Sequence, residues 1–397
     1  MPVAYRSHPP RSAELVIVGG GVVGAATAFY AARAGLRPLL LEGRPALASL
    51  TTPASTGAFR LQFDNREELE LVRGSVELFT NFAAETGQSE YPLGVRQPGY
   101  LWLTTSRKGA ERQRRLVERQ RSWSLEDAEV VDGDRVRERF PYVAEQVVQA
   151  RFRQADGFLD PKALTLGLAT GSGAEVVVSC PVIGFRLEGE RIVGVETPSG
   201  EVATDTVVIA AGPLSGVVAA RAGVELPIST VVRHKLVMPE VPEVPAEAPM
   251  TIDEDTGAHW RPALRGAYLL FTDPATPPSP PTEEVPIDQG FAFRLLDPDS
   301  PVSVARVSPF WKEVWRRGDA HWFLQAGQYT MTADHRPLIG PTGVAGLWVN
   351  TGYSGHGIMG GPSGSRYLVE VMAGKVAPEE NPFRPDRVFE EREHDVL

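Results

Sequence analysis

The sequence contains a single cysteine, Cys180, among its 397 residues. One thiol cannot form a disulfide within the chain, and it cannot supply the several thiolates of a zinc cluster. The seven histidines are never spaced as in the metal-binding pattern His-x-x-x-His. We therefore expect no metal site.

Positive charge and uninterrupted apolar sequence are also scarce. The chain has 40 Lys and Arg against 50 Asp and Glu, a formal net charge of −10. This balance disfavours nucleic acid and anionic membranes as partners, because both require clustered cations. The apolar stretch of residues 15–36 contains five glycines and Arg33, so a turn and a helix fit it better than a membrane span. The first residues lack the basic and then apolar layout of a signal peptide, so we expect a cytoplasmic protein.

The composition is otherwise that of a soluble globular protein. Apolar residues make up 42% of the chain and charged residues 23%. The length predicts two or three domains with a large core.

A glycine motif lies near the N-terminus, in a segment that predicts strand, turn, helix and strand over residues 14–44. Gly19, Gly21 and Gly24 form the pattern G-x-G-x-x-G at the end of the first strand, which is typical of a βαβ unit that binds a dinucleotide. The glycines permit a tight turn, let a pyrophosphate approach the backbone, and let helix and strand pack closely.

Residues beside the motif are candidates for holding the dinucleotide. An acid, Glu42, ends the second strand 18 residues after Gly24, where it would accept hydrogen bonds from the adenosine ribose. The helix N-terminus favours phosphate through its N–H groups and dipole. The candidate contacts of this segment are Val22, Val23, Glu42, Gly43 and Arg44. The motif alone does not distinguish an NAD site from an FAD site.

A second glycine-rich segment, NTGYSGHGIMGGPSG, occupies residues 350–364. Six glycines surround His356. Residues 358–373 then predict a helix, in which Pro362 stands early enough to be tolerated.

The remaining segments predict further strands, helices and loops. Residues 174–212 predict strands joined by tight hairpins. Helical periodicity predicts helices over 65–86 and 108–122. Residues 239–249 and 273–286 are rich in proline and predict surface loops. The second loop could be a lid over a site, but a plain loop is favoured.

Four motifs occur in the order found in one family. They are ASTGAFRLQF (54–63), DGFLDP (156–161), VVIAAG (207–212) and the segment of residues 327–364. On these motifs, residues 14–375 resemble the FAD-dependent amine and amino-acid oxidoreductases of the D-amino-acid oxidase superfamily. Sarcosine oxidase, glycine oxidase and the β subunit of proline dehydrogenase belong to it.

The resemblance implies an α/β fold with two domains. One is a discontinuous, Rossmann-like FAD-binding domain, and the other is a substrate domain built on a mixed, largely antiparallel sheet. The FAD-binding domain would comprise residues 1–85, 146–225 and 326–397. The substrate domain would comprise residues 86–145 and 226–325.

The resemblance also implies how distant segments hold the flavin. Ser55, Thr56 and Gly57 would lie along it, and the GYSGHG segment would bring backbone N–H groups to its pyrimidine edge. His356 would either help to build that turn or contribute only its backbone, with the ring in solvent. Further cofactor contacts are implied at Val176, Ala211, Gly212, Gly355, Gly357, Ile358 and Met359.

Several residues are implied to lie near the substrate. Arg60 aligns with an arginine that binds the substrate carboxylate, for which a guanidinium is suited. The alternative for Arg60 is a salt bridge to Glu67 or Glu68. Tyr329 matches a tyrosine near the flavin, which supports the substrate or simply packs. His259 faces either the substrate cavity or the surface of a strand.

Three positions depart from relatives. Gly327 stands where some carry the cysteine that attaches FAD, which implies non-covalent FAD. Met359 replaces a carboxylate-binding lysine, which disfavours sarcosine and favours a more apolar pocket for a cyclic or bulky side chain. Leu270 aligns with a lysine that activates oxygen in oxidases, which favours a dehydrogenase.

The predicted reaction is FAD-dependent oxidation of the C–N bond of an amino acid or secondary amine, such as sarcosine, glycine or proline. A hydride passes to flavin N5, and the imine is hydrolysed unless it is cyclic and stable. A second hypothesis is an FAD-dependent 2-hydroxy-acid or glycerol-phosphate-type dehydrogenase with His259 as its base. A third is a non-catalytic flavoprotein subunit of a larger complex. The electron acceptor stays open between O2 and another acceptor or partner subunit.

Overall fold

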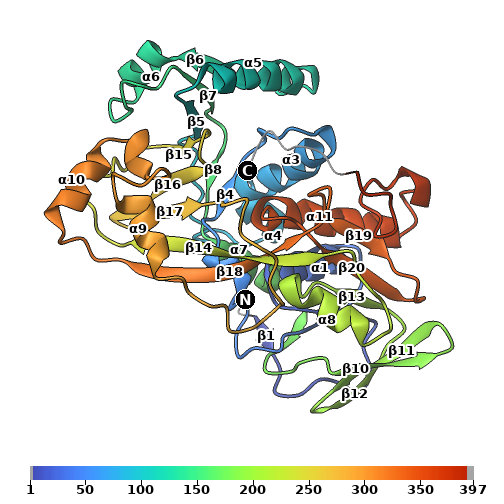
Figure 1. Cartoon of the computed structure of the whole chain (residues 1–397). Helices are drawn as coiled ribbons and strands as arrows, with labels where there is room; N and C mark the ends of the chain where they lie inside the picture. Colours follow the sequence, from blue (N-terminus) through green and yellow to red (C-terminus); the bar gives the residue numbers. More distant parts are fainter. Residues whose placement is uncertain (1–2, 391–397) are drawn as a thin grey trace.

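The structure is a computed structural model that describes residues 3–390 (Figure 1). Within this range the chain forms two large sheets, of seven and eight strands, with a small three-stranded and a small two-stranded sheet. No helix among these residues is both long and apolar enough to cross a membrane. The α/β architecture predicted from the sequence is confirmed.

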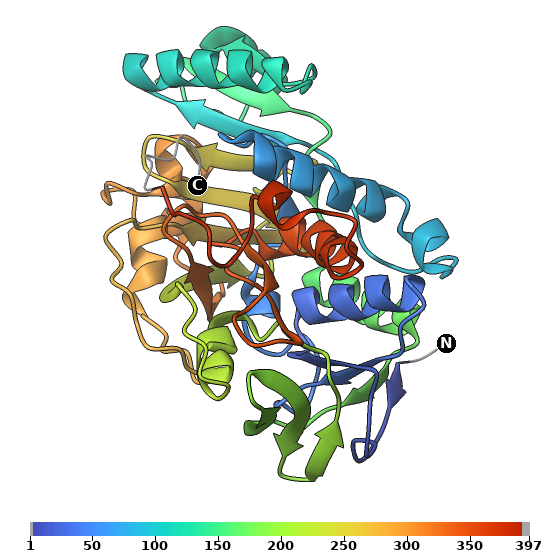
Figure 2. The ribbon, with the colours of Figure 1, turned by 90° about the vertical axis from the view of Figure 1, so that its right-hand side faces the viewer.

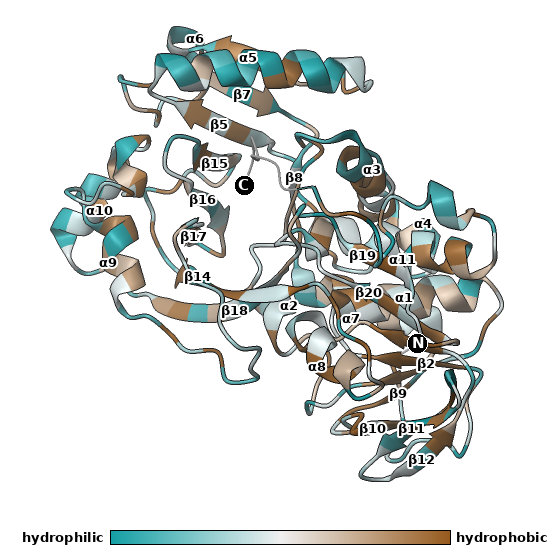
Figure 3. Ribbon diagram, turned by 45° about the vertical axis from the view of Figure 1, so that its right-hand side comes forward, coloured by the Kyte–Doolittle hydropathy of each residue, from teal (hydrophilic) through white to brown (hydrophobic). Residues whose placement is uncertain are grey.

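The seven-stranded sheet is parallel except at one edge. In spatial order its strands are β1 (Ala4–Tyr5), β9 (Glu175–Val177), β3 (Pro38–Leu41), β2 (Leu15–Val18), β13 (Val207–Ile209), β20 (Leu347–Thr351) and β19 (Leu338–Pro341). Only the pair of β19 and β20 is antiparallel in the described part of this sheet. The central strands β2, β3 and β13 are buried along their whole length and appear as apolar ribbons in Figure 3. Continuous burial of this kind is typical of parallel strands covered on both faces.

The helices beside this sheet pack around α1 (Val22–Arg33), the blue helix of Figure 2. This helix packs against α7 (Pro161–Ser172) and α11 (Gly357–Met372). Glycines allow α11 to approach closely. A Cβ added at Gly361 would lie 3.0 Å from Val23 Cγ2, and one at Gly364 would overlap the hydroxyl of Tyr353. Part of the glycine-rich segment 350–364 therefore serves close packing.

The eight-stranded sheet is mixed and largely antiparallel, as the sequence predicted. Its order is β18 (Phe323–Met331), β14 (Ser229–Met238), β17 (Gly266–Phe271), β16 (Ala258–Ala263), β15 (Met250–Asp253), β5 (Tyr100–Thr104), β7 (Gln149–Arg153) and β6 (Glu129–Asp132). The single parallel pair among its described strands joins β15 and β5. Figure 1 shows α5 (Arg107–Ser122) and α6 (Gly133–Arg139) at one end of this sheet, with α9 (Gly290–Leu296) and α10 (Phe310–Arg317) beside β16 and β17.

Shorter elements complete the fold. They are α2 (Thr51–Ala54), β4 (Ala58–Phe59), α3 (Arg66–Thr80), α4 (Phe82–Thr86), β8 (Gly157–Phe158), β10 (Gly184–Glu188), β11 (Arg191–Thr197), β12 (Gly200–Ala203), α8 (Ser215–Ala220), and the 3₁₀ turns η1 (Gly212–Leu214), η2 (Val304–Arg306) and η3 (Pro378–Glu380). The predicted hairpins are β10–β11 and β11–β12. The predicted helix over 65–86 is divided at Asn81 into α3 and α4.

The predicted domain boundaries cut across the second sheet. They assign residues 146–225 and 326–397 to the FAD-binding domain, yet β7 and β18 pair within the eight-stranded sheet. The pairing of strands cannot be deduced from a single sequence. The predicted domain boundaries were therefore placed by the positions of the family motifs. The outermost residues of the predicted domain, 1–2 and 391–397, lie outside the described part of the chain.

A Gly364→Ala variant tests the close packing of α11. Alanine favours a helix over glycine by about 1 kcal/mol, but overpacking costs about 1–3 kcal/mol. We expect the overlap with Tyr353 to dominate and thermal denaturation to occur several degrees lower. Gly216→Ala in α8 is the control, because its Cβ would lie 3.5 Å from Ile228 Cδ1. Equal melting temperatures for Gly364→Ala and the wild type would contradict this account.

Candidate functional site

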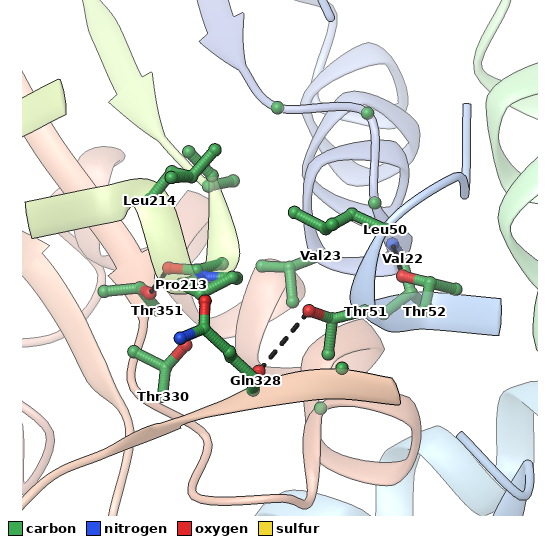
Figure 4. A pocket seen from close by; sticks show the side chains of 18 of the residues that line it. Val22, Val23, Leu50, Thr51, Thr52, Pro213, Leu214, Gln328, Thr330 and Thr351 are labelled. Carbon is green, nitrogen blue, oxygen red and sulfur yellow. Dashed lines mark hydrogen bonds between the residues drawn. The ribbon is translucent and has the colours of Figure 1, made fainter. Parts of the chain in front are cut away.

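A cavity of about 310 Å³ opens where four parallel strands end. The strands β2, β3, β13 and β20 each deliver the residues that follow them to its wall. The β18 strand of the second sheet closes it from the other side, and Figure 4 shows Gln328 and Thr330 of that strand facing Thr51 and Pro213. Ligands of open parallel sheets bind at such carboxyl ends.

The glycine motif forms one end of the cavity. Gly19 has a φ of +112°, and a Cβ there would lie 2.5 Å from Ala210 O. A Cβ at Gly24 would overlap the carbonyl oxygen of Gly19, so only glycine lets α1 start this close to β2. The residue before the helix, Gly21, provides no side-chain cap. The N-terminus of α1 therefore opens onto the cavity as an anion site.

Glu42 fixes the loop that carries this motif. Its Oε2 accepts a hydrogen bond from Gly20 N at 2.6 Å, and its Oε1 accepts one from Arg44 N at 2.7 Å. Burial raises the pKa of Glu42, although these two hydrogen bonds oppose the shift. The carboxylate also lines the cavity and retains lone pairs for a hydroxyl group.

Arg261 and Lys235 of the second sheet hold residues 53–56, a segment whose Ser55 lines the cavity. Arg261 Nε donates to Thr56 O at 2.8 Å, and Arg261 Nη2 donates to the same oxygen. Lys235 Nζ donates to Pro53 O at 2.7 Å and to Ser55 O at 2.8 Å. Burial lowers the pKa of Arg261 to about 10 and that of Lys235 to about 7. These bonds tie residues 53–56 to the second sheet beside the cavity.

Arg60 lies outside the cavity lining, in a nest of aromatic rings, and is only 4% exposed. Its guanidinium carbon is 4.9 Å from the ring centre of Phe63, 5.4 Å from that of Trp102 and 6.0 Å from that of Tyr100. Such faces stabilise a cation when water is excluded. Arg60 Nη2 also lies 3.3 Å from His356 Nε2.

His356 links Arg60 to Glu68. Its Nδ1 lies 3.1 Å from Glu68 Oε1, and its side chain is 11% exposed. The ring is therefore buried between two charged groups, and the alternative of a ring in solvent is wrong. The other predicted partner, Glu67, lies 3.4 Å from Arg336 Nη2.

The other predicted substrate residues occupy different surroundings. Tyr329 lines the cavity, and its ring packs where a Cβ at Gly355 would lie 2.5 Å from Cε2. Burial raises the pKa of Tyr329. Met359 is buried in α11, outside the cavity lining. His259 is also outside it, with Nδ1 2.8 Å from Gly257 O, and burial lowers its pKa to about 4.

The predicted cofactor residues divide into two groups. Those that line the cavity are Gly19, Gly21, Val22, Val23, Glu42, Gly43, Arg44, Ser55, Ala211, Gly212, Gly355, Gly357 and Ile358. Those that do not are Gly24, Thr56, Gly57, Val176, His356 and Met359. Gly24 acts through the packing of α1 on β2, and Thr56 offers its carbonyl to Arg261. Val176 is wholly buried within β9.

Sequence reasoning placed Tyr329 of the second sheet near the flavin but missed other residues of that sheet in the cavity wall. Arg233, His234 and Gln328 come from β14 and β18, whose partners no local pattern reveals. Leu270, in β17, lines the cavity as predicted from its alignment. Its partner on the neighbouring strand β14 is Lys235. The buried amino group of Lys235 therefore lies on the strand next to the one that carries Leu270.

The proline-rich loop of residues 273–286 is a surface loop, as predicted, and it also borders the cavity. Glu283 is part of the lining, and its Oε2 lies 3.3 Å from Arg44 Nη1. Gln328 anchors the loop, because its Oε1 accepts from Thr282 N at 2.9 Å and its Nε2 donates to Pro280 O at 2.8 Å.

The sequence profile of the family described as FAD dependent oxidoreductase matches residues 14–371. Dimethylglycine dehydrogenase of Rattus norvegicus mitochondria is 27% identical over 375 residues, which cover 90% of this chain and 42% of that protein. The chain thus spans about two fifths of that relative's length.

Solved structures share the fold. L-Proline dehydrogenase from P. horikoshii superposes with a TM-score of 0.82 at 23% identity, covering 95% of this chain and 98% of that one. Glycine oxidase from Geobacillus kaustophilus gives a TM-score of 0.81 at 23% identity, covering 96% and 100%. A Rossmann-like FAD-binding part with a substrate part is therefore the architecture of this chain.

A Gly21→Ala variant tests the cavity as the FAD site. The added Cβ would have Thr52 Oγ1 as its nearest neighbour at 3.2 Å, so a small shift of that side chain accommodates it. It would stand where a pyrophosphate must approach the backbone. We expect the Kd for FAD to rise about tenfold or more, as when a charge-assisted hydrogen bond is lost. Fluorescence titration of the apoprotein measures this.

The melting temperature of the apoprotein should stay within a few degrees of the wild type, since Gly21 has an ordinary backbone conformation. Unchanged FAD affinity in a folded Gly21→Ala protein would contradict the assignment.

Proposed function

Because the chain belongs to the FAD dependent oxidoreductase family, we propose that it oxidises the C–N bond of an amino acid or carboxylate-bearing secondary amine. The observation that carries this proposal is Arg60, a cation enclosed by three aromatic rings. The relatives and structural neighbours named above act, by their names, on dimethylglycine, proline and glycine, all of which carry a carboxylate next to the amine.

The cavity fits FAD on grounds of its own geometry. The glycine cradle leaves no room for a Cβ at Gly19 or Gly24, and a helix N-terminus whose N-cap residue has no side chain faces the space. A second helix N-terminus, that of α11, contributes Gly357 and Ile358 to the same wall. Two positive helix ends favour a cofactor such as FAD, which carries a negatively charged pyrophosphate and a ring that takes up electrons. When bound, FAD supplies the acceptor for the hydride that leaves the carbon next to the amine.

We propose that FAD binds without a covalent link through cysteine. Position 327, where some relatives attach it, is glycine, and a Cβ there would lie 3.0 Å from Ala54 Cβ. Cys180 is buried and does not line the cavity.

The protein's own groups would bind the substrate, orient it and keep its amine neutral. A guanidinium binds a carboxylate in a bidentate manner and so orients the carbon beside it. The rings around Arg60 exclude water, which strengthens that ion pair. Arg60, Lys235 and Arg261 place positive charge on this side of the molecule, and like charge disfavours a protonated amine. A neutral amine keeps the lone pair that stabilises the carbon as the hydride departs.

We propose a domain division that follows the sheets. The substrate domain would then include β7 and β18 with the rest of the eight-stranded sheet.

An Arg60→Gln variant tests the role of the carboxylate. Anaerobic flavin reduction would be followed with matched ligands: proline against pyrrolidine, and sarcosine against dimethylamine. In whichever pair reduces the flavin faster, we expect the wild type to be reduced faster by the compound that carries the carboxylate. Loss of a charge-assisted hydrogen bond should reduce that preference about 10- to 100-fold in the variant.

Arg66→Gln is the matched control, because Arg66 is exposed and lies 3.9 Å from Glu70 on α3. Arg66→Gln should leave the rates of flavin reduction by both members of a pair unchanged. If Arg60→Gln slowed reduction by both members of a pair equally, the carboxylate would not be the group that Arg60 recognises.

A further inference from the structure

We propose that Glu68 and His356 are positioning residues that orient Arg60 for the carboxylate of the substrate. This inference rests on the proposed function, because it assigns the second layer of the same site. The three side chains come from distant parts of the chain: the loop after β4, the first turn of α3, and the residue before α11.

The direction of the hydrogen bonds follows from chemistry. A guanidinium has only donors, so Arg60 Nη2 must donate to a lone pair on His356 Nε2. The ring proton then lies on Nδ1, which donates to Glu68 Oε1 at 3.1 Å. The arrangement therefore requires a neutral imidazole of one tautomer, with a carboxylate behind it. A carboxylate that orients a histidine, which in turn orients a third group, is a recurrent device of enzyme sites.

Glu68 is itself fixed in place. Its Oε2 accepts from Asn65 Nδ2 at 2.6 Å, and its backbone N–H donates to Asn65 Oδ1 at 2.8 Å, so Asn65 caps α3 and holds the carboxylate. Burial acts to raise the pKa of Glu68, and the hydrogen bonds from His356 and Asn65 oppose this shift. The N-terminal position in α3 also favours a negative charge.

His356 also belongs to the cavity region through its neighbours. Gly355 and Gly357 line the cavity on either side of it, and its ring meets Phe63 edge-on at 5.2 Å between centres. The same Phe63 ring lies beside the Arg60 guanidinium. The turn that forms the cavity wall and the arginine that binds the carboxylate are therefore held as one unit.

The charge arrangement suits recognition of an anion. A neutral His356 ring between Glu68 and Arg60 fixes the orientation of the guanidinium. It also keeps the buried Glu68 carboxylate from pairing with the guanidinium directly. Glu68→Gln keeps the size of the side chain and an oxygen that accepts from Nδ1, but it removes the charge. His356→Asn is too short to bridge the two groups.

The experiment measures the Kd of pyrrole-2-carboxylate from its effect on the flavin spectrum of the holoenzyme. We expect His356→Asn to raise this Kd about tenfold, because the link to Arg60 is lost. Glu68→Gln should raise it by a smaller factor, because a neutral hydrogen bond replaces a stronger, charge-assisted one. The KM for a carboxylate substrate should rise similarly, with kcat changed much less. The Kd for pyrrole, which lacks the carboxylate, should not change. Glu67→Gln is the control, because Glu67 is a half-exposed neighbour on the same helix turn.

A double-mutant cycle separates positioning from general damage. In an Arg60→Gln background, Glu68→Gln should have no further effect on the Kd for pyrrole-2-carboxylate. Equal losses for pyrrole and pyrrole-2-carboxylate, or a full effect of Glu68→Gln without Arg60, would overturn the relay. If His356→Asn does not fold, His356→Gln replaces it. Its amide oxygen can still accept from Arg60, so an intermediate Kd supports the relay and a wild-type Kd overturns it.

The two proposals fail in different ways. If Arg60→Gln leaves the Kd for pyrrole-2-carboxylate unchanged, the carboxylate role of Arg60 fails and the relay fails with it. If Arg60→Gln weakens binding but Glu68→Gln and His356→Asn do not, the proposed function survives and the relay is overturned.

Discussion

The remaining structure depends on glycines around the cavity, which let the backbone approach other parts of the chain closely. The helix α1 can start directly behind β2 only because residue 24 carries no side chain toward the Gly19 carbonyl. The same condition recurs in the C-terminal segment, where Gly355 makes room for the Tyr329 ring. These contacts bring two helix N-termini to one space at the ends of parallel strands. FAD, which has a pyrophosphate in its middle and an electron-accepting ring at one end, fits such a space.

Buried cations join this frame to the second sheet. Arg261 and Lys235 reach out of β16 and β14 and donate to carbonyls of residues 53–56, beside the cavity. Burying a charge is costly unless it is hydrogen-bonded, and the carbonyls supply those bonds. Around the Arg60 guanidinium lie three aromatic rings and the His356 ring. Of the three cations, we therefore assign Arg60 to the substrate, whereas Lys235 and Arg261 brace the segment between the sheets.

The sequence predicted the parts of the fold whose signals are local. The strand at 15–18, the glycine motif and Glu42 lie within one βαβ unit, and each has a local pattern that can be interpreted alone. The role of His356 could not be predicted, because Glu68 lies 288 residues before it in the chain. The pairing of β7 and the anchoring of the 273–286 loop by Gln328 could not be predicted for the same reason: strand pairing and side-chain contacts over long separations leave no local pattern. Resemblance to a family supplied Arg60, but not the residues that hold it.

An anaerobic visible spectrum of the purified protein tests the central claim most directly. The spectrum would be recorded before and after adding proline, sarcosine, glycine, dimethylglycine, D-alanine and 2-hydroxyglutarate in turn. The account predicts flavin bands, and bleaching of those bands by at least one of the amino acids. Absence of flavin bands after FAD is supplied would contradict the cofactor site. Bleaching by 2-hydroxyglutarate and by none of the amines would contradict oxidation at a C–N bond.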